Sequence, residues 1–432
     1  MLADAQQVEL TIEKVAAGGW TIGRHHGQVV LIRGAIPGER VTVWIDRADR
    51  RVAYANTRDV LEPSRDRRPP PFDPLCGGGV FAHVGYERQL ALKGEIVQDA
   101  FSRLARHPLP DVPRVEGSPE AGYRMRARLH ARGERIGFYR EGTHQMCDAA
   151  PTGQLRSDAL DAASAVVRSL HRRSQDSVTS IAVSENIAAD ERAVHVELSA
   201  VGRLDESAFA EAVALAGLRG ISARRPSGDV LTAGDPAVSD PIERVAGGRA
   251  RDGELRRHAE SFFQANRYLL PALVSTVLDA VLDGGHVVDL YAGVGLFSVA
   301  LASAGHSDIT AVEGDRTSAR DLRQNARPFA ARVHARAVSV EEYLSSARGD
   351  ISTLIADPPR TGMSKEALEG VLRRSPRRIV YVSCDPPTLA RDARRLFDAG
   401  YTLESIRAFD LFPNTAHVES LALFRQSGES RN

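Results

Sequence analysis

One thiol in the chain lies where a reactive group would be useful. Cys384 follows the apolar stretch Arg378–Val382, which predicts a buried strand, and paired prolines then end that strand before a helical segment. Ligands of open α/β sheets collect outside the carboxyl ends of the strands, and the amino end of a following helix favours a thiolate. A lone cysteine is more often a small buried hydrophobe. Its position makes Cys384 a candidate nucleophile that needs matching chemistry around it.

A glycine loop of the kind that holds a nucleotide-like ligand spans residues 289–298, Asp-Leu-Tyr-Ala-Gly-Val-Gly-Leu-Phe-Ser. Gly293 and Gly295 let a ligand approach the backbone, and the helix that follows offers free amides. Glu313 ends the next predicted strand, where a carboxylate can accept hydrogen bonds from both ribose hydroxyls. Ser298 replaces the third glycine of the dinucleotide pattern, so the loop predicts S-adenosylmethionine as the ligand. An ordinary tight turn is the alternative.

Two further sites with polar residues lie at the ends of predicted strands. Asp357 comes after Leu354–Ala356 and begins an Asp-Pro-Pro run, whose prolines fix the direction of the carboxylate. His417 and Glu419 precede a final predicted strand, Ser420–Phe424, and a buried carboxylate beside an imidazole can act as a general base. Taken alone, these are a strand-ending turn and a hydrogen-bonded loop pair. Beside a methyl-donor loop and a thiol, they indicate contacts to cofactor or substrate.

The elements that must position these groups alternate between strand and helix, as in a parallel α/β sheet. The predicted pairs are 286–290 with 296–304, 309–312 with 317–330, 353–356 with 364–373, and 378–382 with 388–399. Near the amino-terminus, short strands separated by glycine turns predict a small barrel, such as an oligonucleotide-binding fold, with strands at 8–15, 28–32 and 40–45. We therefore expect three domains: a barrel at 1–62, a central α+β domain at 63–240, and an α/β domain at 241–432.

The central region carries one patterned feature. A strand pair is predicted within Tyr123–Arg140, and the period-two spacing of Arg124, Arg126 and Arg128 places all three on one face. Such a face suits solvent and a phosphate backbone equally well. A helix at about 86–107 is expected to pack on the α/β domain, and the sequence of residues 140–240 is uninformative.

Composition limits the function classes. The 432 residues include 56 basic and 56 acidic side chains, so the net charge is zero and no global field points to nucleic acid. Three cysteines, far apart and odd in number, argue against a disulfide framework and for a reducing cytoplasm. The amino-terminus lacks a secretory pattern, and the sequence contains no apolar run of membrane-spanning length. A cytoplasmic monomer without membrane contact is expected.

The motifs together resemble a known family. The carboxyl-terminal half resembles the S-adenosylmethionine-dependent RNA 5-methyluridine methyltransferases, through residues 261–266, 289–298, 357–362, 383–392 and 414–420, in that order. The amino-terminal barrel resembles the TRAM domain, an RNA-binding module. The resemblance implies a Rossmann-like methyltransferase domain with a mostly parallel seven-stranded sheet, a small OB-like barrel and a central α+β domain, and it is weakest over about 140–240.

The resemblance also implies roles for single residues. Cys384 would add to carbon 6 of uracil, which makes carbon 5 nucleophilic toward the methyl group, and Glu419 would then remove the proton from carbon 5, with His417 as support. Gln264, Tyr291, Glu313 and Asp357 match the family's cofactor contacts, with Gly293 from the glycine loop; Asp357 is also placed to touch the uracil. Leu296 stands where many relatives carry asparagine, so one polar cofactor contact is expected to be missing. The target base must leave its stack to reach the thiol.

Many relatives carry a four-cysteine iron–sulfur site after the barrel. Here Pro70 and Gly79 stand at two ligand positions around Cys76, while Cys147 lies about five residues before the fourth position, which aligns with Thr152. One thiol cannot hold a cluster that needs four. We therefore expect neither an iron–sulfur cluster nor another metal.

Other readings remain open. Within the family, the barrel favours 23S ribosomal RNA, because transfer-RNA enzymes of this type often lack it, but a transfer-RNA 5-methyluridine methyltransferase is the alternative. A second class is methyl transfer without a cysteine, to an amine or a ribose. A third is a non-catalytic RNA-binding protein with a vestigial methyltransferase domain.

Overall fold

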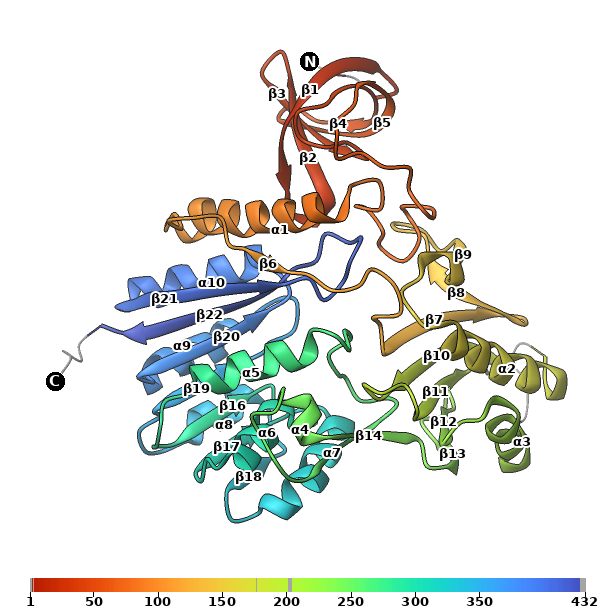
Figure 1. Ribbon diagram of the computed structural model, residues 1–432, viewed down its shortest axis with the longest axis vertical. Helices are drawn as coiled ribbons and strands as arrows, with labels where there is room; N and C mark the ends of the chain where they lie inside the picture. Colours follow the sequence, from red (N-terminus) through yellow and green to blue (C-terminus); the bar gives the residue numbers. More distant parts are fainter. Residues whose placement is uncertain (1, 3, 176, 201–203, 428–432) are drawn as a thin grey trace.

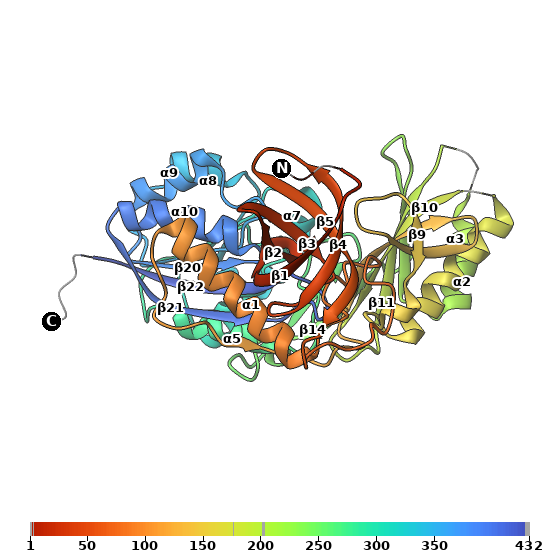
Figure 2. The same ribbon diagram turned by 90° about the horizontal axis from the view of Figure 1, so that it is seen from above.

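The protein has three folded parts (Figure 1). The computed structural model describes residues 2, 4–175, 177–200 and 204–427. A small barrel sits above two mixed α/β parts, one built from the carboxyl-terminal half and one from the central region. Seen from above, the barrel lies over the junction between the other two parts (Figure 2). The boundaries predicted at residues 62 and 240 remain predictions.

The amino-terminal barrel is closed by five strands in the order β1-β2-β3-β5-β4. Their bounds are β1 Gln7–Ala16, β2 Trp20–His25, β3 Gln28–Arg33, β4 Arg40–Ala48 and β5 Val52–Glu62. Apolar and polar residues alternate along these strands, and the apolar side chains fill the interior. Val30, Ile32, Val43 and Ile45 are 0% exposed. The predicted small barrel is confirmed; β2 and β5 were not among the strands that the sequence singled out.

The central part is a seven-stranded sheet in the order β13-β12-β11-β10-β7-β8-β9. The strands are β7 Arg126–Arg132, β8 Arg135–Tyr139, β9 Met146–Asp148, β10 Val178–Glu185, β11 Arg192–Leu198, β12 Gly220–Arg224 and β13 Val230–Gly234. Helices α2 Ser157–Arg173 and α3 Glu206–Ala216 bury their apolar stripes in the same core as this sheet. The ribbon β14–β15, Ala237–Pro241 with Glu254–His258, leads into the last part.

The carboxyl-terminal part is a doubly wound sheet in the order β18-β17-β16-β19-β20-β22-β21-β6. Its strands are β16 Val287–Leu290, β17 Ile309–Val312, β18 Val333–Arg336, β19 Thr353–Ala356, β20 Arg378–Ser383, β21 Tyr401–Phe409, β22 Glu419–Gln426 and the short β6 Val115–Glu116. The five strands from β18 to β20 run parallel, and β22 is antiparallel. The predicted Rossmann-like sheet is confirmed, with β6 as an eighth strand that the sequence did not indicate.

Helices cover both faces of this sheet. One core joins it to α5 Leu270–Ala280, α6 Leu296–Ala304 and α7 Arg316–Ala326, next to the short α4 Ile242–Val245. The other joins it to α8 Val340–Ser346, α9 Lys365–Arg374 and α10 Pro386–Asp398. Helix α1, Tyr86–Ala100, continues as a π-helical turn to Ala105 and packs in this second core, as expected for the helix predicted at about 86–107.

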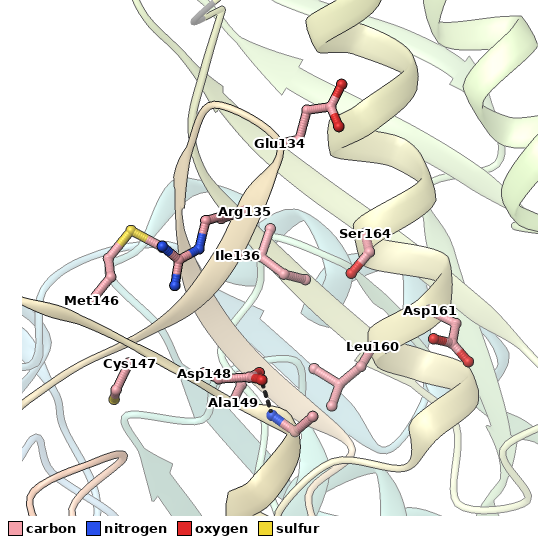
Figure 3. A pocket seen from close by; sticks show the side chains of 11 residues that line it. Glu134, Arg135, Ile136, Met146, Cys147, Asp148, Ala149, Leu160, Asp161 and Ser164 are labelled. Carbon is pink, nitrogen blue, oxygen red and sulfur yellow. Dashed lines mark hydrogen bonds between the residues drawn. The ribbon is translucent and has the colours of Figure 1, made fainter.

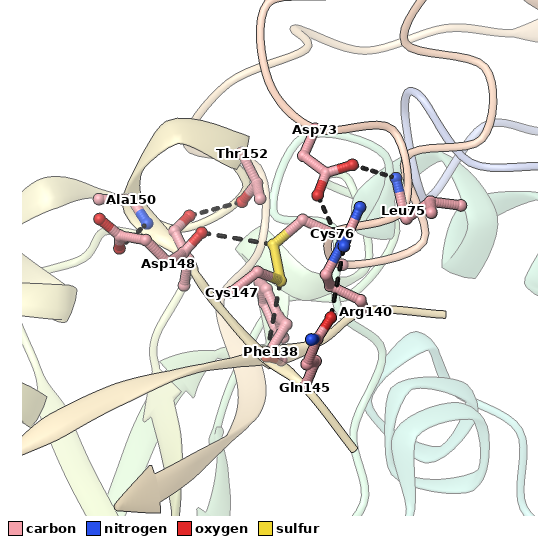
Figure 4. Close-up of a disulfide and its surroundings, with 12 residues drawn as sticks. Asp73, Leu75, Cys76, Phe138, Arg140, Gln145, Cys147, Asp148, Ala150 and Thr152 are labelled. Carbon is pink, nitrogen blue, oxygen red and sulfur yellow. Dashed lines mark hydrogen bonds and ion pairs between the residues drawn. A yellow bond between two sulfur atoms is a disulfide. The ribbon is translucent and has the colours of Figure 1, made fainter. Parts of the chain in front are cut away.

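A disulfide joins Cys76 to Cys147, whose Cα atoms are 5.9 Å apart (Figure 4). The expectation of unpaired cysteines is therefore wrong, and the cysteine pattern gives no support to the reducing compartment that was inferred from it. The pairing depends on tertiary structure: Glu141 N donates to Leu75 O at 2.8 Å, which brings the β8–β9 hairpin against the loop that carries Cys76. Cys384 is the free cysteine. The prediction that no iron–sulfur cluster binds stays a prediction.

Helix α1 holds the loop between β21 and β22 through a buried ion pair. The Lys93 ammonium contacts the Asp410 carboxylate, both side chains are 0% exposed, and Nζ of Lys93 also donates to Phe412 O at 3.1 Å. Four residues earlier in α1, Gln89 donates to Oδ1 of Asn414 at 2.9 Å and accepts from its backbone N at 2.9 Å. The loop that leads to His417 and Glu419 is thus fixed from outside its own sheet.

We predict that Lys93→Met lowers the free energy of unfolding by about 3–5 kcal/mol, because the Asp410 carboxylate then stays buried without its partner. Urea unfolding followed by circular dichroism measures the change. The double variant Lys93→Met/Asp410→Leu is the control and should regain most of the loss, since it removes both charges. A single variant as stable as the parent would contradict this account.

Candidate functional site

The polar groups singled out in the sequence meet at the carboxyl edge of the parallel strands. Leu290, Ala356 and Tyr381 are in register on β16, β19 and β20. Tyr291 and Asp357 follow the first two directly, and Cys384 follows the end of β20. Because parallel strands end at the same edge, these three side chains lie around one opening.

Glu419 lies beside Cys384 because of an antiparallel pairing. Ser383 is paired with Ser420, so the next positions, Cys384 and Glu419, face each other across the end of β20 and β22. Asp385 caps α10 by accepting from Thr388 N at 2.9 Å, which begins the helix immediately after the thiol. Two strands and one helix start therefore hold the thiol and the carboxyl group.

Burial controls the acidity of the Cys384 thiol. Burial is the largest effect, and together with the nearby Glu419 and Asp357 carboxylates, and against a smaller opposing effect of Arg360, it raises the pKa of Cys384 to about 12. The sequence suggested that the amino end of α10 favours a thiolate. In the folded protein, desolvation and neighbouring carboxylates outweigh that effect, so the thiol is protonated at neutral pH.

Glu419 and Asp357 form a second electrostatic unit. The Glu419 side chain is buried, and this burial together with Asp357 raises its pKa well above the usual value. Burial raises the pKa of Asp357 to about 7, although Nε2 of Gln264 donates to its Oδ2 at 3.0 Å. Raised pKa values of this kind suit buried carboxyl groups to general acid–base catalysis.

His417 is neutral at pH 7. Burial, together with the charges of Arg360 and Lys93, lowers its pKa to about 4. Its side chain lines the same cavity as Cys384, where a neutral imidazole can donate one hydrogen bond and accept another. The structure thus places His417 on the wall of the thiol cavity.

The glycine loop provides an open approach to the sheet edge. Gly293 has φ +56°, and a side chain there would meet nothing within 4 Å, so its backbone is accessible to a ligand. Gly295 has φ +93°, and an added Cβ would lie 2.9 Å from Leu322 and Val299, so this position needs glycine. Gly293 N donates to Oε2 of Glu313 at 2.8 Å, which ties the loop to the end of β17.

Three carboxyl groups around this loop favour a positively charged ligand. Burial raises the pKa of Asp289 to about 7, with contributions from Asp357 and Glu313, and burial also raises the pKa of Glu313. Oδ2 of Asp289 accepts from Ser298 N at 3.1 Å, while Oδ1 is buried without a hydrogen-bond partner in the described part of the chain. A ligand with a sulfonium and an ammonium group would relieve this repulsion, so the residues fit S-adenosylmethionine.

The thiol opens into a cavity of about 480 Å³ between the carboxyl-terminal and central parts. It is lined by Gly77, Gly78, Arg124, Arg128, His130, Phe138, Tyr139, Glu141, Cys384, Phe412, Thr415 and His417. Of the central-part residues, only the arginines carried a signal in the sequence. The sequence carried no sign of the aromatic residues that line this cavity, because each of them stands in an ordinary strand pattern.

The three patterned arginines do different things. Burial of Met125, Ala127 and Leu129 confirms that the arginines share the opposite face. Arg126 donates to the carbonyls of Ser261 and Glu260 at 2.9 and 3.1 Å and so joins the two parts of the chain. Arg124 and Arg128 line the thiol cavity. Arg124 donates to Gln154 Oε1 at 2.5 Å and to the carbonyl of Arg126 at 3.0 Å, so the exposed Arg128 is the better candidate for a phosphate contact.

A second hollow of about 260 Å³ lies elsewhere in the central part (Figure 3). It is formed by the β8–β9 hairpin and α2, with the acidic side chains of Glu134, Asp148 and Asp161 and the guanidinium of Arg135 around it. Its lining comes entirely from the central part, and it brings together no nucleophile and base. In the described residues, no helix is long and apolar enough to cross a membrane.

Comparisons with known proteins agree with this geometry. A family model described as tRNA (Uracil-5-)-methyltransferase matches residues 309–427, and the TRAM domain model matches residues 5–57. The chain is 31% identical to the 23S rRNA (uracil(1939)-C(5))-methyltransferase RlmD of Aeromonas salmonicida, over 98% of this chain and 97% of that protein. It is 27% identical to an uncharacterized RNA methyltransferase of Aquifex aeolicus, over 96% and 98% of the two chains.

One solved structure shares the whole fold. The tRNA (uracil-54, C5)-methyltransferase of Pyrococcus abyssi, in complex with S-adenosyl-L-homocysteine, superposes with a TM-score of 0.73. The match covers 96% of this chain and all of that one, at 23% identity. It supports the three-part architecture described above.

We predict that alkylation of Cys384 by iodoacetamide is slow at neutral pH and rises about tenfold per pH unit, because only the thiolate reacts and its fraction grows toward a pKa of about 12. Glu419→Gln should speed alkylation at a fixed alkaline pH, because it removes a nearby negative charge. Glu254→Gln, an exposed glutamate, is the matched control and should leave the rate unchanged. A rate that is flat with pH would contradict the raised pKa.

Proposed function

This chain belongs to the S-adenosylmethionine-dependent RNA (uracil-C5-)methyltransferase family, and from that premise we propose that it forms 5-methyluridine in RNA through a covalent bond from Cys384. The observation that carries the proposal is the pairing of a half-buried thiol with Glu419 across the end of β20 and β22, at the mouth of a cavity that can hold a base. S-adenosylmethionine supplies the methyl group when bound.

Cys384 acts first as the nucleophile. Its proton leaves to solvent through the open cavity, so that Glu419 stays unprotonated, and the sulfur bonds to carbon 6 of uracil, so that carbon 5 gains the electron density to attack the methyl group. The pKa of Cys384 is raised in the protein without a ligand, so the thiolate becomes favourable only when a positive charge lies near it. A bound methyl donor would supply such a charge at the carboxyl edge of the sheet.

Glu419 acts second as the base. After the methyl group is attached, the proton on carbon 5 passes to a Glu419 oxygen, and the electron pair of the broken C–H bond expels the Cys384 thiolate from carbon 6. A buried glutamate with a raised pKa binds this proton strongly. His417, neutral beside the thiol, can hydrogen-bond an oxygen of the uracil ring.

The remaining site residues hold and orient the cofactor. Glu313 is at the position for the ribose hydroxyls, and Gly293 offers the open backbone. Gln264 fixes the Asp357 carboxylate, and Tyr291 lies at the end of β16 next to it. Leu296, the first residue of α6, offers only apolar contact at this point.

We further propose ribosomal RNA, specifically 23S, as the substrate. The support is the matching TRAM domain and the relatives named as 23S rRNA methyltransferases, one of which is 31% identical along nearly the whole chain. Transfer RNA is the second candidate, because the whole-fold match is to a tRNA enzyme. We also propose that the protein acts as a monomer in the cytoplasm.

The purified protein, with labelled S-adenosylmethionine and separate ribosomal and transfer RNA from cells that lack the gene, should yield 5-methyluridine in the ribosomal fraction on nucleoside mass analysis. Cys384→Ala should abolish the product, because no other group activates carbon 5. Glu419→Gln should slow turnover by about 10²–10⁴-fold, the usual contribution of a general base, and leave an RNA–protein adduct that survives denaturation.

Glu254→Gln is again the matched control and should retain full activity. Product in transfer RNA alone would move the substrate to the second candidate. Full methylation by Cys384→Ala would refute the covalent proposal and favour the cysteine-free class.

A further inference from the structure

Both segments that the Cys76–Cys147 disulfide joins form part of the wall of the thiol cavity. Gly77 and Gly78 follow Cys76 directly and line the cavity on the side of the loop. Cys147 is paired with Phe138 in the β8–β9 hairpin, and Phe138 lines the same cavity. Loop and hairpin pack closely here, because a Cβ added to Gly77 would lie 2.9 Å from the Phe138 ring. The disulfide therefore fixes two sides of the cavity relative to each other.

The loop side of the cavity also contacts the segment that carries the reactive groups. Phe81 N donates to Asn414 O at 2.9 Å. Val80 and Phe81 belong to a small buried core, and Ala416 packs against it. The loop after Cys76 is thus fixed on the segment that leads to the catalytic end of β22. Loss of the disulfide would therefore act on the hairpin and not on this loop.

The noncovalent contacts of the hairpin are weaker than the disulfide. Strand β9 has three residues, is the last strand of its sheet and pairs with β8. Glu141 N donates to Leu75 O at 2.8 Å, and the Arg140–Asp73 ion pair, also at 2.8 Å, is exposed to solvent and so contributes little stability. Short elements at a sheet edge open locally more readily than core strands do. We therefore expect the disulfide to be the main restraint on the hairpin.

One sulfur of the pair is accessible to a reductant. Cys76 is 2% exposed, whereas Cys147 is only partly buried and lines the 260 Å³ hollow of the central part (Figure 3). Sγ of Cys76 lies 3.4 Å from Asp148 O, and Sγ of Cys147 lies 3.5 Å from Phe138 O (Figure 4). Once reduced, each thiol can donate to that carbonyl oxygen. Reduction therefore leaves both sulfur atoms with a partner in the place they already occupy.

We propose that the Cys76–Cys147 disulfide is a reversible redox clasp on the thiol cavity. In the oxidised protein the clasp holds the hairpin against the loop and keeps the cavity in the shape that accepts RNA. Reduction by a dithiol releases the hairpin and weakens RNA binding, while cofactor binding at the glycine loop is unchanged. The inference rests on the proposed function, because it takes the cavity at Cys384 as the place of the target base.

The reduction is an ordinary thiol–disulfide exchange. A thiolate of the dithiol bonds to Sγ of Cys147, the protein S–S bond breaks, and Cys76 leaves as a thiolate that takes up a proton. The second thiolate of the dithiol then displaces Cys147, which also takes up a proton, and the dithiol becomes a disulfide as two electrons pass to the protein. Disulfides of cytosolic proteins are usually of this reversible kind, which agrees with the location proposed above.

Methylation assays of the full chain in two redox states test the clasp. We predict that dithiothreitol, a small dithiol, raises the KM for ribosomal RNA by about 3- to 30-fold, because the RNA then binds only the fraction of molecules whose hairpin is closed. The kcat and the KM for S-adenosylmethionine should not change. Alkylation with N-ethylmaleimide after denaturation reports the redox state: the oxidised protein should be labelled at Cys384 alone and the reduced protein at all three cysteines.

A matched variant and hydrogen exchange separate the clasp from other effects of the reductant. Cys76→Ser/Cys147→Ser should show the raised KM without dithiothreitol and no further change with it. Glu254→Gln, which keeps the disulfide, should respond as the parent does. Amides of residues 140–148 should exchange faster in the reduced parent and in the double variant. Amides of β16 and β19 should stay protected in both, which shows that the protein remains folded.

The outcomes separate the clasp from the proposed function. Methylation with the same KM for RNA in both redox states would overturn the clasp and leave the function standing. Faster exchange of residues 140–148 on reduction, without methylation in either state, would support the clasp and count against the function. A double variant whose KM still rises with dithiothreitol, or a parent protein labelled at all three cysteines under oxidising conditions, would also overturn the clasp.

Discussion

The buried ion pair between Lys93 and Asp410 is the contact on which the placement of the reactive groups depends. Two charges out of water are costly unless they meet each other, so α1 and the β21–β22 loop can adopt only the arrangement in which they do. The reciprocal bonds between Gln89 and Asn414 add a second fixed point. Arg68, in the linker after the barrel, also donates to Asn414 at 2.7 Å. Helix α1 and the linker after the barrel therefore both hold the loop that leads to His417 and Glu419.

The same low-dielectric environment sets the chemistry of the site. Asp289, Asp357 and Glu419 all have raised pKa values because they are buried near one another, and the Cys384 thiol is held protonated by the same burial and charges. Positive charge brought to this edge lowers each of these pKa values. On the proposed function, the site gains its reactivity when a cationic methyl donor binds. This arrangement limits reaction of the thiol with other electrophiles.

Features that depend on neighbouring residues could be predicted from the sequence. The glycine loop, Glu313 and the strand-end positions of Asp357 and Cys384 follow from short patterns, and the structure brings these groups to one edge as expected. The strand alternation also placed Arg124, Arg126 and Arg128 on one face. What the sequence could not show is that Arg126 is used to join two parts of the chain, because its partners Glu260 and Ser261 are more than a hundred residues away.

Features that depend on distant contacts were missed for the same reason. Lys93 and Asp410 look like ordinary surface charges in the sequence, and Cys76 and Cys147 are separated by 71 residues with no pairing signal. The acidity of Cys384 was misjudged because a helix start is visible in the sequence, whereas burial and the facing Glu419 are not.

The covalent bond from Cys384 is the central claim, and trapping it tests that claim most directly. RNA with 5-fluorouridine at the target position cannot lose the group on carbon 5 as a proton, so elimination of the cysteine is blocked. With S-adenosylmethionine present, mass spectrometry of the digested protein should find one methylated fluorouridine attached to the peptide that contains Cys384. Methylation of ordinary RNA at full rate, with no adduct or with the adduct on another residue, would contradict the account.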